Sequence, residues 1–528
     1  MLNRREFLIK SAQVAAGAGL GTALAGFPGY ADPAGASEPS GAAWKDLARR
    51  ISGPVLRPSD AGFAKLARPN NLRYASKLPQ GIARCLSAGD VAQAILWSRE
   101  NDIRLVARSG GHSYAGYSTT YGLMTDLSLM NQVSYDQSSG IVTIAGGVRN
   151  DSLYSALADA NATITHGRCP TVGGAAFLLG GGIGFNMRRF GLGCDLMVES
   201  ELVTADGEIL TLNSAENSSL FWACQGGAGG NFGINTSFKL RTFPTSDLTV
   251  FNIVWKSKLE KLFPILISCL QGAPSSLGSR VSINATTPVR FASGNQTAVT
   301  LLGQIVGTPA DLADILAPAY QVSAPARETI QIMSYWDAQN NFLETAGTPE
   351  RYQERSGFII GAPAPAAIDT VFYWIRRWPG TSESANFVLF QTGAQVNARA
   401  PEDSAFVHRN SDWLMTIALD WGPYDGPLTV QRNLGWQASF YNAIRKFTSG
   451  AYQNFPDPSL RTWQQDYYGA NLSVLETIKA AVDPDQVFRN PQSIRPSRTS
   501  SLRDVAPDRT ASLPGPLRGN FGFIAKTA

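Results

Sequence analysis

Histidine and cysteine, the side chains that most often bind metals in proteins, are scarce in this sequence. Only 3 histidines and 5 cysteines occur among 528 residues. No two cysteines are spaced as Cys-x-x-Cys and the histidines lack the spacing of metal ligands, so we expect neither zinc nor haem. Five cysteines are also too few for a disulfide framework in so long a chain. Their odd number leaves at least one thiol outside any disulfide within the chain.

Charged residues are scarce as well, which limits the possible partners. They make up 16% of the chain, and the net charge of +4 is not gathered in a long basic run. Because nucleic acids bind to concentrated basic surfaces, we do not expect nucleic acid as a partner. The 44% of hydrophobic residues is typical of a globular protein, and the length predicts two lobes.

Two common nucleotide-binding motifs are missing. No segment completes Gly-x-Gly-x-x-Gly, and no glycine is followed by lysine. The sequence therefore predicts neither a Rossmann dinucleotide site nor a Walker phosphate loop.

Residues 1–31 have the features of an export signal. Arg4 and Arg5 precede an aromatic residue and a weakly apolar stretch, and Gly29 and Ala31 are small residues of the kind that a signal peptidase reads. This segment resembles the twin-arginine signals by which the bacterial Tat machinery exports folded proteins to the periplasm or the medium. A retained membrane anchor is the alternative, but the stretch is short and weakly hydrophobic for a span. We expect cleavage and no stable membrane insertion.

Two patterns follow each other along the rest of the chain. Up to Pro244, short apolar runs predict strands at 103–107, 140–144 and 200–204, and a capped helix is expected at 90–100. Beyond Thr245, long alternating segments at 386–396 and 413–421 indicate a broad sheet, and 463–488 indicates a helix broken at Asp483-Pro484.

Glycine is concentrated in three segments before Pro244: 108–114, 173–184 and 226–233. Exposed N–H groups in such turns form anion-binding sites that suit a pyrophosphate. The alternative is that these glycines only allow tight turns and close packing. His112 lies in the first segment and Cys169 lies just before the second.

These segments resemble a known family. The sequences RSGGHSYAGYS (108–118), GRCPTVG (167–173) and GGGIGFNMRRFGLGCD (180–195) are similar to those of the berberine-bridge-enzyme-like FAD-linked oxidases, which belong to the vanillyl-alcohol-oxidase superfamily. Further similar blocks are FWACQGG, NFG, YYGAN and DPDQVF, in that order along the chain. The resemblance extends from Pro79 to Ile494.

The resemblance implies an α+β fold with a PCMH-type FAD-binding domain in two sequence segments. An inserted substrate domain of antiparallel sheet plus helices separates them. The expected parts are a linker (32–43), the FAD-binding domain (44–244 and 455–496), the substrate domain (245–454) and a loosely ordered tail (497–528).

The resemblance also implies that FAD is bound through two covalent bonds, one to His112 and one to Cys169. The alternatives are a non-covalent flavin, with His112 a turn residue and Cys169 a small buried hydrophobe. His166 is expected to pack or orient rather than to catalyse. The other residues expected at the cofactor are Arg108, Ser109, Gly110, Gly111, Ser113, Tyr114, Gly173, Gly174, Gly182, Gly184, Asp195, Gly230, Gly233, Ile234 and Asn471.

Catalytic roles follow from the same resemblance. Val172 is expected beside the oxygen-reactive carbon of the flavin, where valine is associated with O₂ access; the alternative is that it only packs in the core. Tyr467 and Tyr468 are the expected catalytic bases. A tyrosine that acts as a base near pH 7 needs its pKa lowered by about three units, or about 4 kcal/mol.

The rest of the expected catalytic environment is less defined. Arg376, Arg377 and Arg409 are candidates for the cation that lowers the tyrosine pKa. Gln391 and Gln395 either face the flavin ring or point to solvent. No acidic residue of the substrate domain stands out as a base. Aromatic residues at 335–336, 372–374 and 378 either line a substrate groove or belong to the core.

The expected activity is oxidation of an alcohol or carbohydrate hydroxyl of a small-molecule substrate, with hydride transfer to flavin N5 and O₂ reduced to H₂O₂. Two alternatives stay open: a dehydrogenase that uses another acceptor, and a flavin-holding protein that binds a metabolite without turnover. The substrate, the carbon oxidised and the oligomeric state are not defined by the sequence.

Overall fold

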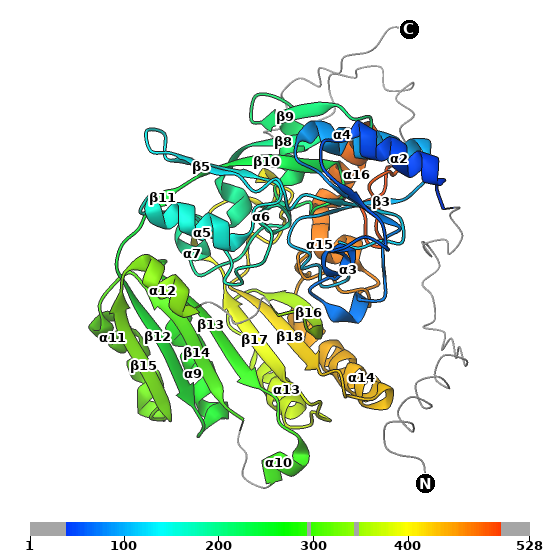
Figure 1. Ribbon diagram of the computed structural model, residues 1–528. Helices are drawn as coiled ribbons and strands as arrows, with labels where there is room; N and C mark the ends of the chain where they lie inside the picture. Colours follow the sequence, from blue (N-terminus) through cyan, green and yellow to red (C-terminus); the bar gives the residue numbers. More distant parts are fainter. Residues whose placement is uncertain (1–37, 293–296, 343–347, 498–528) are drawn as a thin grey trace, which may run out of the picture. The chain divides into compact units, whose positions relative to one another are not determined.

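A computed structural model describes residues 38–292, 297–342 and 348–497 (Figure 1). The expected export signal at 1–31 lies outside these residues, as do most of the expected linker and nearly all of the expected tail. No helix among the described residues is both long and apolar enough to cross a membrane. The chain folds as the α+β architecture that the sequence predicts.

The first structural layer is a small, mostly parallel sheet. Its strand order is β1-β2-β4-β3, with β2, β4 and β3 parallel. Helix α4 connects β2 to β3; Ser87 caps its N-terminus by accepting a hydrogen bond from the backbone of Asp90. Helix α2 begins inside the expected linker, because Ser40 acts as its N-cap. The bounds are α2 (Gly41–Arg50), β1 (Val55–Leu56), α3 (Phe63–Ala67), β2 (Gly81–Arg84), α4 (Ala88–Glu100), β3 (Leu105–Arg108) and β4 (Leu123–Asp126).

A second, antiparallel sheet of order β5-β6-β10-β8-β9 packs beside the first. The strands expected at 140–144 and 200–204 belong to it as β6 and β8, and the turn at Asp206-Gly207 joins β8 to β9. The elements are β5 (Val133–Asp136), β6 (Ile141–Ala145), α5 (Asn150–Asp159), β7 (Ala162–Thr163), α6 (Gly174–Leu179), α7 (Met187–Phe190), β8 (Met197–Val203), β9 (Ile209–Asn213), α8 (Ser218–Cys224), β10 (Ile234–Arg241) and β11 (Phe243–Pro244), which pairs with β7.

The residues expected to form the substrate domain contain a seven-stranded antiparallel sheet of order β15-β12-β14-β13-β17-β18-β16. Figure 1 shows α13 and α14 on the side of this sheet that is turned away from the first two sheets. The strands are β12 (Leu248–Trp255), β13 (Leu277–Asn284), β14 (Val299–Ile305), β15 (Arg327–Met333), β16 (Arg351–Ile359), β17 (Ala385–Gln391) and β18 (Trp413–Trp421). The helices are α9 (Leu259–Gln271), α10 (Pro288–Ala292), α11 (Pro309–Val322), α12 (Tyr335–Phe342), α13 (Pro365–Ile375) and α14 (Pro427–Ile444).

Alternation along β17 and β18 separates the two faces of this sheet. Phe387 packs on Phe440 of α14, and the Gln437 side chain of the same helix donates to the Ile417 carbonyl oxygen. The intervening residues, among them Val388 and Asp420, face the opposite side. One face therefore packs on helices and the other is available to line a cavity.

The C-terminal segment returns to the first two sheets. Helices α15 (Trp463–Tyr468) and α16 (Leu472–Val482) replace the single helix expected at 463–488, because Gly469 at φ 49° introduces a short 3₁₀ turn between them. The second helix ends at the expected break. Buried Lys479 anchors the segment by donating to the carbonyl oxygens of Asn231 and Phe488.

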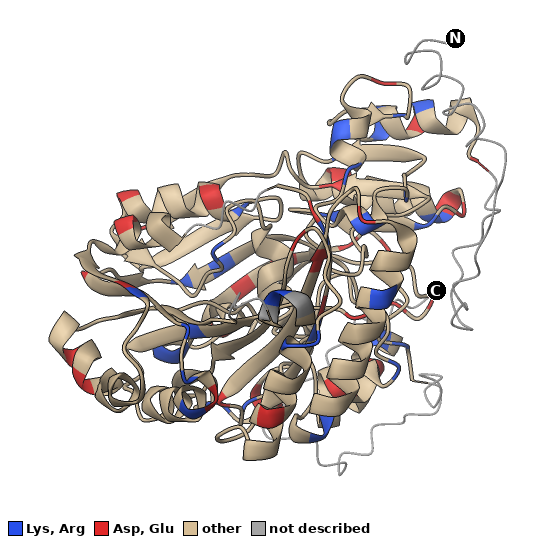
Figure 2. Ribbon diagram, turned by 90° about the horizontal axis from the view of Figure 1, so that it is seen from below, with Lys and Arg blue, Asp and Glu red and all other residues tan. Residues whose placement is uncertain are grey.

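Charge is mixed over the ribbon. Figure 2 shows Lys and Arg interspersed with Asp and Glu over the helices and strands. The five cysteines all lie within the described residues and none of them forms a disulfide; Cys85, Cys194 and Cys224 are buried.

Candidate functional site

One cavity of about 630 Å³ lies between the glycine-rich segments and the open face of the seven-stranded sheet. Its lining includes residues of all three glycine-rich segments, of β13, β16, β17 and β18, and of the C-terminal segment. Ligand sites in proteins commonly enclose roughly 300–1,000 Å³, so this cavity has the size of a binding site for a cofactor or small molecule.

The first two glycine-rich segments meet backbone to backbone. A Cβ atom at Gly110 would lie 2.2 Å from the backbone nitrogen of Gly173, and one at Gly173 would lie 2.4 Å from that of Gly110. Only glycine at both positions allows this approach. The contact brings His112 and Cys169, which are 57 positions apart in the chain (169 − 112), to the same part of the cavity wall.

His112 and Cys169 share a neighbour. His112 Nε2 lies 2.9 Å from Thr171 Oγ1, and Cys169 Sγ lies 3.6 Å from the same oxygen. Burial, with a smaller effect from the charge of Arg149, lowers the pKa of His112 to about 4. The ring is therefore neutral near pH 7 and has a nitrogen lone pair available for bonding.

Helix α5 holds the loop that carries Cys169. The Asn150 side chain donates to the Cys169 carbonyl oxygen at 2.9 Å, and its backbone N–H donates to the Val172 carbonyl oxygen at 3.0 Å. The Tyr154 hydroxyl donates to the Gly167 carbonyl oxygen. These bonds fix the backbone of the loop from one side.

His166 is buried and hydrogen-bonded to its neighbours. Its Nε2 lies 2.7 Å from the Tyr335 hydroxyl, which also accepts a hydrogen bond from the Asn186 side chain. Its ring stacks on Trp336 with 5.6 Å between ring centroids. Burial lowers the pKa of His166 to about 4. His166 does not line the cavity.

Most of the residues expected at the cofactor line this cavity. They are Ser109, Gly110, Gly111, His112, Ser113, Tyr114, Cys169, Val172, Gly173, Gly184, Gly230, Gly233 and Ile234, together with the two expected catalytic tyrosines, Tyr467 and Tyr468.

Five of the expected residues do not line the cavity, and three of these have a local structural role. The Arg108 guanidinium donates to the carbonyl oxygens of Leu66, Ala67 and Ser118. Gly174 lies in the first turn of α6, and Gly182 adopts φ 87°, a conformation that favours glycine.

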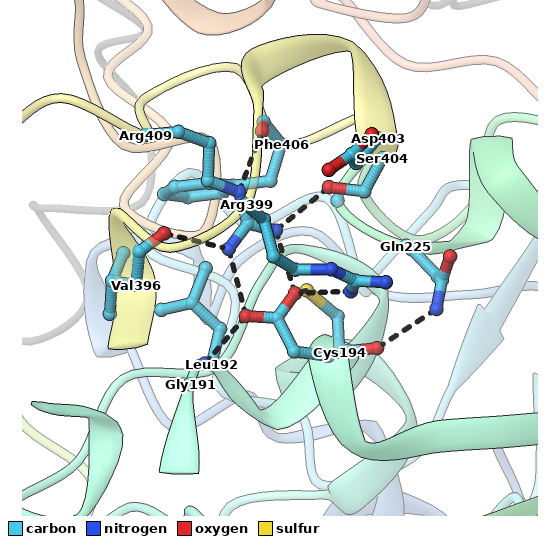
Figure 3. Close-up of polar contacts among 12 residues, drawn as sticks. Gly191, Leu192, Cys194, Gln225, Val396, Arg399, Asp403, Ser404, Phe406 and Arg409 are labelled. Atoms are coloured by element: carbon cyan, nitrogen blue, oxygen red, sulfur yellow. Dashed lines mark hydrogen bonds and ion pairs between the residues drawn. The ribbon is translucent and has the colours of Figure 1, made fainter. Parts of the chain in front are cut away.

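Asp195 is the fourth of these residues, and it forms a buried ion pair instead of facing the cavity. Its carboxylate accepts hydrogen bonds from Nη1 and Nη2 of Arg409 at 2.8 and 2.7 Å and from Arg399 at 2.9 Å; both arginines are labelled in Figure 3. Burial alone would raise the pKa of Asp195, but the hydrogen bonds and charge of Arg409 lower it overall. The pair links the loop after α7 to the segment between β17 and β18.

Asn471, the fifth, was expected to bond to the flavin. Its side-chain amide instead donates to the carbonyl oxygens of Pro401 and Ser404, at 2.8 and 3.0 Å. It therefore holds the loop between β17 and β18.

The two tyrosines are buried, and within the described part of the chain no cation bonds to either hydroxyl. Tyr467 Oη accepts from the backbone N–H of Asp457 at 2.9 Å, and Tyr468 Oη donates to the Gly227 carbonyl oxygen at 3.2 Å. Burial raises the pKa of both side chains well above the usual value of 10. Both hydroxyls therefore favour the protonated form in this structure.

The expected stabilising cations lie elsewhere. Arg376 pairs with Glu260 at 2.5 Å, the Arg377 guanidinium stacks 3.8 Å from the Tyr373 ring centroid, and Arg409 is engaged by Asp195.

Gln391 lies on the helix-facing side of β17 and donates to the carbonyl oxygen of Leu270, and Gln395 is exposed. None of these five side chains lines the cavity.

The sequence interpretation missed two carboxylates. Asp420 of β18 and Glu354 of β16 line the cavity. Burial raises the pKa of Asp420 to about 6, with smaller contributions from the charges of Glu350 and Glu383 and an opposing hydrogen bond from Ser384. The signal was present: Thr416, Ala418 and Asp420 alternate with Ile417, Leu419 and Trp421, which places Asp420 on the polar face.

The aromatic residues of the cavity are not those considered from the sequence. The expected groups at 335–336, 372–374 and 378 are absent from its lining. Phe372 and Trp378 are core residues, and Tyr335 belongs to the His166 network. The aromatic residues that line the cavity are Tyr114, Tyr117, Phe177, Phe185, Phe390, Tyr452, Phe455, Tyr467, Tyr468 and Phe488.

The residues present fit FAD. The third glycine-rich segment reaches the cavity through Ala228, Gly229 and Gly230, and a Cβ atom at Gly230 would meet nothing within 4 Å. Such open backbone turns suit a pyrophosphate. Elsewhere in the lining, the neutral imidazole of His112 and the thiol of Cys169 lie beside each other, ready to contact a planar ring.

Comparisons with known proteins agree. A family model described as "FAD binding domain" matches residues 79–213, and one described as "Berberine and berberine like" matches residues 451–495. The carbohydrate oxidase of Microdochium nivale is 30% identical over 473 residues, covering 84% of this chain and 93% of the relative.

Solved structures show the same fold. Wild-type BBE-like 1 of Physcomitrella patens superposes with a TM-score of 0.77 at 26% identity over 86% of this chain and 99% of that one. Glucooligosaccharide oxidase of Acremonium strictum, described with a 6-S-cysteinyl, 8α-N1-histidyl FAD, gives a TM-score of 0.75 at 26% identity over 85% and 98%. This chain is an FAD-linked oxidoreductase and belongs to the berberine-bridge-enzyme-like family of FAD-linked oxidases.

Proposed function

We propose that this protein holds FAD by covalent bonds to both His112 and Cys169 and oxidises a hydroxyl group of a carbohydrate or related alcohol, with O₂ as the electron acceptor. The observation that carries the proposal is the convergence of His112 and Cys169 at one part of the cavity wall, in a cavity whose sheet face bears Asp420. The carbohydrate oxidase and glucooligosaccharide oxidase to which the chain is similar support the choice of substrate class.

In this proposal, FAD supplies the hydride acceptor for the substrate carbon. Asp420 takes the proton from the substrate hydroxyl. Its pKa of about 6 leaves the carboxylate ionised at pH 7 yet close enough to neutrality to accept a proton. Glu354 and Asn386, which line the same face of the sheet, provide acceptors and donors for further hydroxyl groups.

The tyrosines and Val172 have supporting roles. Tyr467 and Tyr468 remain protonated and form part of the cavity wall. Val172 lines the cavity three residues after Cys169, where its small apolar side chain leaves room for O₂.

We also propose that residues 1–31 direct the folded protein through the Tat machinery to the periplasm or the medium, with cleavage near Ala31. A covalent cofactor fits this route, because an exported enzyme has no means of reloading FAD. The mass of the protein recovered from the periplasm tests the cleavage site.

Anaerobic spectroscopy tests the activity. Sugars, oligosaccharides, polyols and other alcohols are added to the purified protein while the flavin absorbance is followed. A substrate bleaches the flavin, and O₂ then restores the colour with formation of H₂O₂. Bleaching with very slow recovery in O₂ would indicate a dehydrogenase. Binding without bleaching by any compound would indicate a metabolite-binding protein.

Acid precipitation tests the covalent bonds. Flavin stays in the pellet of the unmodified protein, because the bonds survive denaturation. We expect His112→Ala and Cys169→Ala each to keep one bond and the double variant to release all flavin. Release of yellow flavin from the unmodified protein would contradict the proposal.

A further inference from the structure

Thr171 lies between the two side chains proposed to bond to the flavin. Its Oγ1 is 2.9 Å from His112 Nε2 and 3.6 Å from Cys169 Sγ. Thr171 itself does not line the cavity, whereas His112 and Cys169 do. The Thr171 hydroxyl therefore contacts both groups from outside the cavity lining.

The hydrogens of this bridge can be arranged in only one way that leaves His112 Nδ1 reactive. A threonine hydroxyl has one hydrogen to donate. If it donates to Nε2, the proton of the neutral ring sits on Nδ1 and blocks that nitrogen. If it accepts from Nε2–H, Nδ1 keeps its lone pair and the hydroxyl hydrogen can point at the Cys169 sulfur. Only Nε2 of this ring contacts Thr171, so Nδ1 is the nitrogen left for bonding.

The position of Thr171 is fixed by its neighbours along the chain. The Pro170 carbonyl oxygen accepts from the backbone of Asp151 at 2.9 Å, and the Val172 carbonyl oxygen accepts from the backbone of Asn150 at 3.0 Å. On the other side, the Gly173 backbone lies against Gly110. Thr171 is thus held between helix α5 and the segment that carries His112.

We propose that Thr171 is a positioning residue for covalent flavin attachment, orienting His112 so that Nδ1 forms the bond and holding the Cys169 sulfur beside it. This role rests on the covalent attachment proposed above. Each attachment forms one C–N or C–S bond and breaks a flavin C–H bond together with the Nε2–H bond of the imidazole or the S–H bond of the thiol. The two protons and two electrons released are taken up by O₂, which becomes H₂O₂.

Three variants of the full chain test this role. Thr171→Val removes the hydroxyl and keeps the shape, and Thr171→Ser keeps the hydroxyl. Thr125→Val is the matched control, because the buried Thr125 hydroxyl on β4 has no hydrogen-bond partner among the described residues. Intact mass under denaturing conditions counts the flavins and bonds per chain, and peptide mapping locates them.

We expect two bonds in nearly all chains of the unmodified protein, of Thr171→Ser and of Thr125→Val. In Thr171→Val the fraction of chains with both bonds should fall about tenfold, because misplaced reacting groups lose rate steeply. Equal and complete attachment in Thr171→Val and the unmodified protein would overturn the role of Thr171 alone. Absence of any bond in the unmodified protein would overturn the covalent proposal itself.

A second measurement does not depend on any variant. Digestion of the unmodified protein yields a histidyl flavin whose two ring-nitrogen isomers are separable. We expect the bond at Nδ1. A bond at Nε2 would overturn the proposal, since that nitrogen faces Thr171.

Discussion

Arg409 holds the carboxylate of Asp195 with both terminal nitrogens, at 2.8 and 2.7 Å, although 214 positions separate the two residues in the chain. The Arg409 side chain is fully buried and that of Asp195 is 6% exposed. Removing Arg409 would leave the buried Asp195 carboxylate with Arg399, whose side chain is 36% exposed, as its remaining ion-pair partner.

We therefore expect Arg409→Met to lower the free energy of unfolding by about 3 kcal/mol. Thermal unfolding monitored by circular dichroism measures the effect. The control is Lys239→Met, which removes a surface pair with Glu199 whose side chains are 47% and 30% exposed. Loss of that surface pair should cost less than about 1 kcal/mol. Equal stability losses in both variants would contradict the assigned importance of the buried pair.

The ion pair of Asp195 and Arg409 also predicts how the stability of the folded protein depends on pH. The pKa of Asp195 is lower in the folded protein than the usual 3.8, so the pair's contribution is complete above about pH 4 and is lost as the pH falls through the lower folded value. The stability difference between the unmodified protein and Asp195→Asn should accordingly shrink in acid. Unfolding midpoints between about pH 3 and 7 check this, and a difference that grows in acid would contradict it.

The close approach of the Gly110 and Gly173 backbones, here called the glycine seam, predicts that one added methyl group strongly lowers both flavin binding and stability. In Gly110→Ala, the added Cβ would lie 2.2 Å from the Gly173 nitrogen, so the two segments must separate. We expect less bound flavin per chain and an unfolding free energy lower by about 3 kcal/mol or more. The flavin absorbance relative to the protein absorbance, with the unfolding midpoint, measures both effects.

Gly435→Ala provides the matched control for the seam. Gly435 lies within α14, and a Cβ there would meet nothing within 4 Å. Since alanine favours helix more than glycine does, we expect a gain of about 0.5–1 kcal/mol and unchanged flavin content. Equal behaviour of the two alanine variants would show that the seam does not constrain the fold.

Asp420 predicts the acid limb of the activity profile. A base must be unprotonated, so kcat/KM should fall as the pH decreases through about 6, the pKa to which burial raises Asp420. Asp420→Asn should lower kcat by about 10²–10⁴-fold and abolish this limb. Glu383→Gln removes a negative charge that contributes to the raised pKa, and should move the limb to lower pH. An unchanged limb in Asp420→Asn would assign it to another group.

In contrast to Asp420→Asn, replacing either Tyr467 or Tyr468 should leave the acid limb of the activity profile in place. Because both phenols remain protonated, Tyr468→Phe should keep the acid limb near the pKa of about 6 that Asp420 has. Tyr467→Phe should also keep it, with some loss of stability because the Asp457 N–H then lacks its acceptor. Loss of the limb in either variant would restore tyrosine as the base.

The sequence predicts well which residues in and beside the glycine-rich segments line the cavity, because local motifs define them. His112, Cys169 and Val172 each lie in or beside a short segment whose glycines allow close approach, and all three line the cavity. The pairing of Gly110 with Gly173 follows from the same motifs only after folding, since nothing in either segment specifies its partner.

Long-range pairing explains the incorrect interpretations. Asp195 ends the 180–195 block that resembles the family and was expected at the cofactor, yet its partners Arg399 and Arg409 lie 204 and 214 positions away. Asn471 is bonded to carbonyl groups about 70 positions away. No local pattern reveals such partners. Asp420, in contrast, was recognisable from the alternation of its strand.

The division of β17 and β18 into a face that packs on helices and a face that lines the cavity has an evolutionary consequence. Val388 and Ala418 line the cavity, whereas Phe387 and Ile417 beside them contact α14. Replacement of the cavity-lining residues alone, which occupy every second position, would therefore change the cavity surface and leave the scaffold intact. Gene duplication followed by drift at these few alternate positions is a short route to new specificities within one architecture.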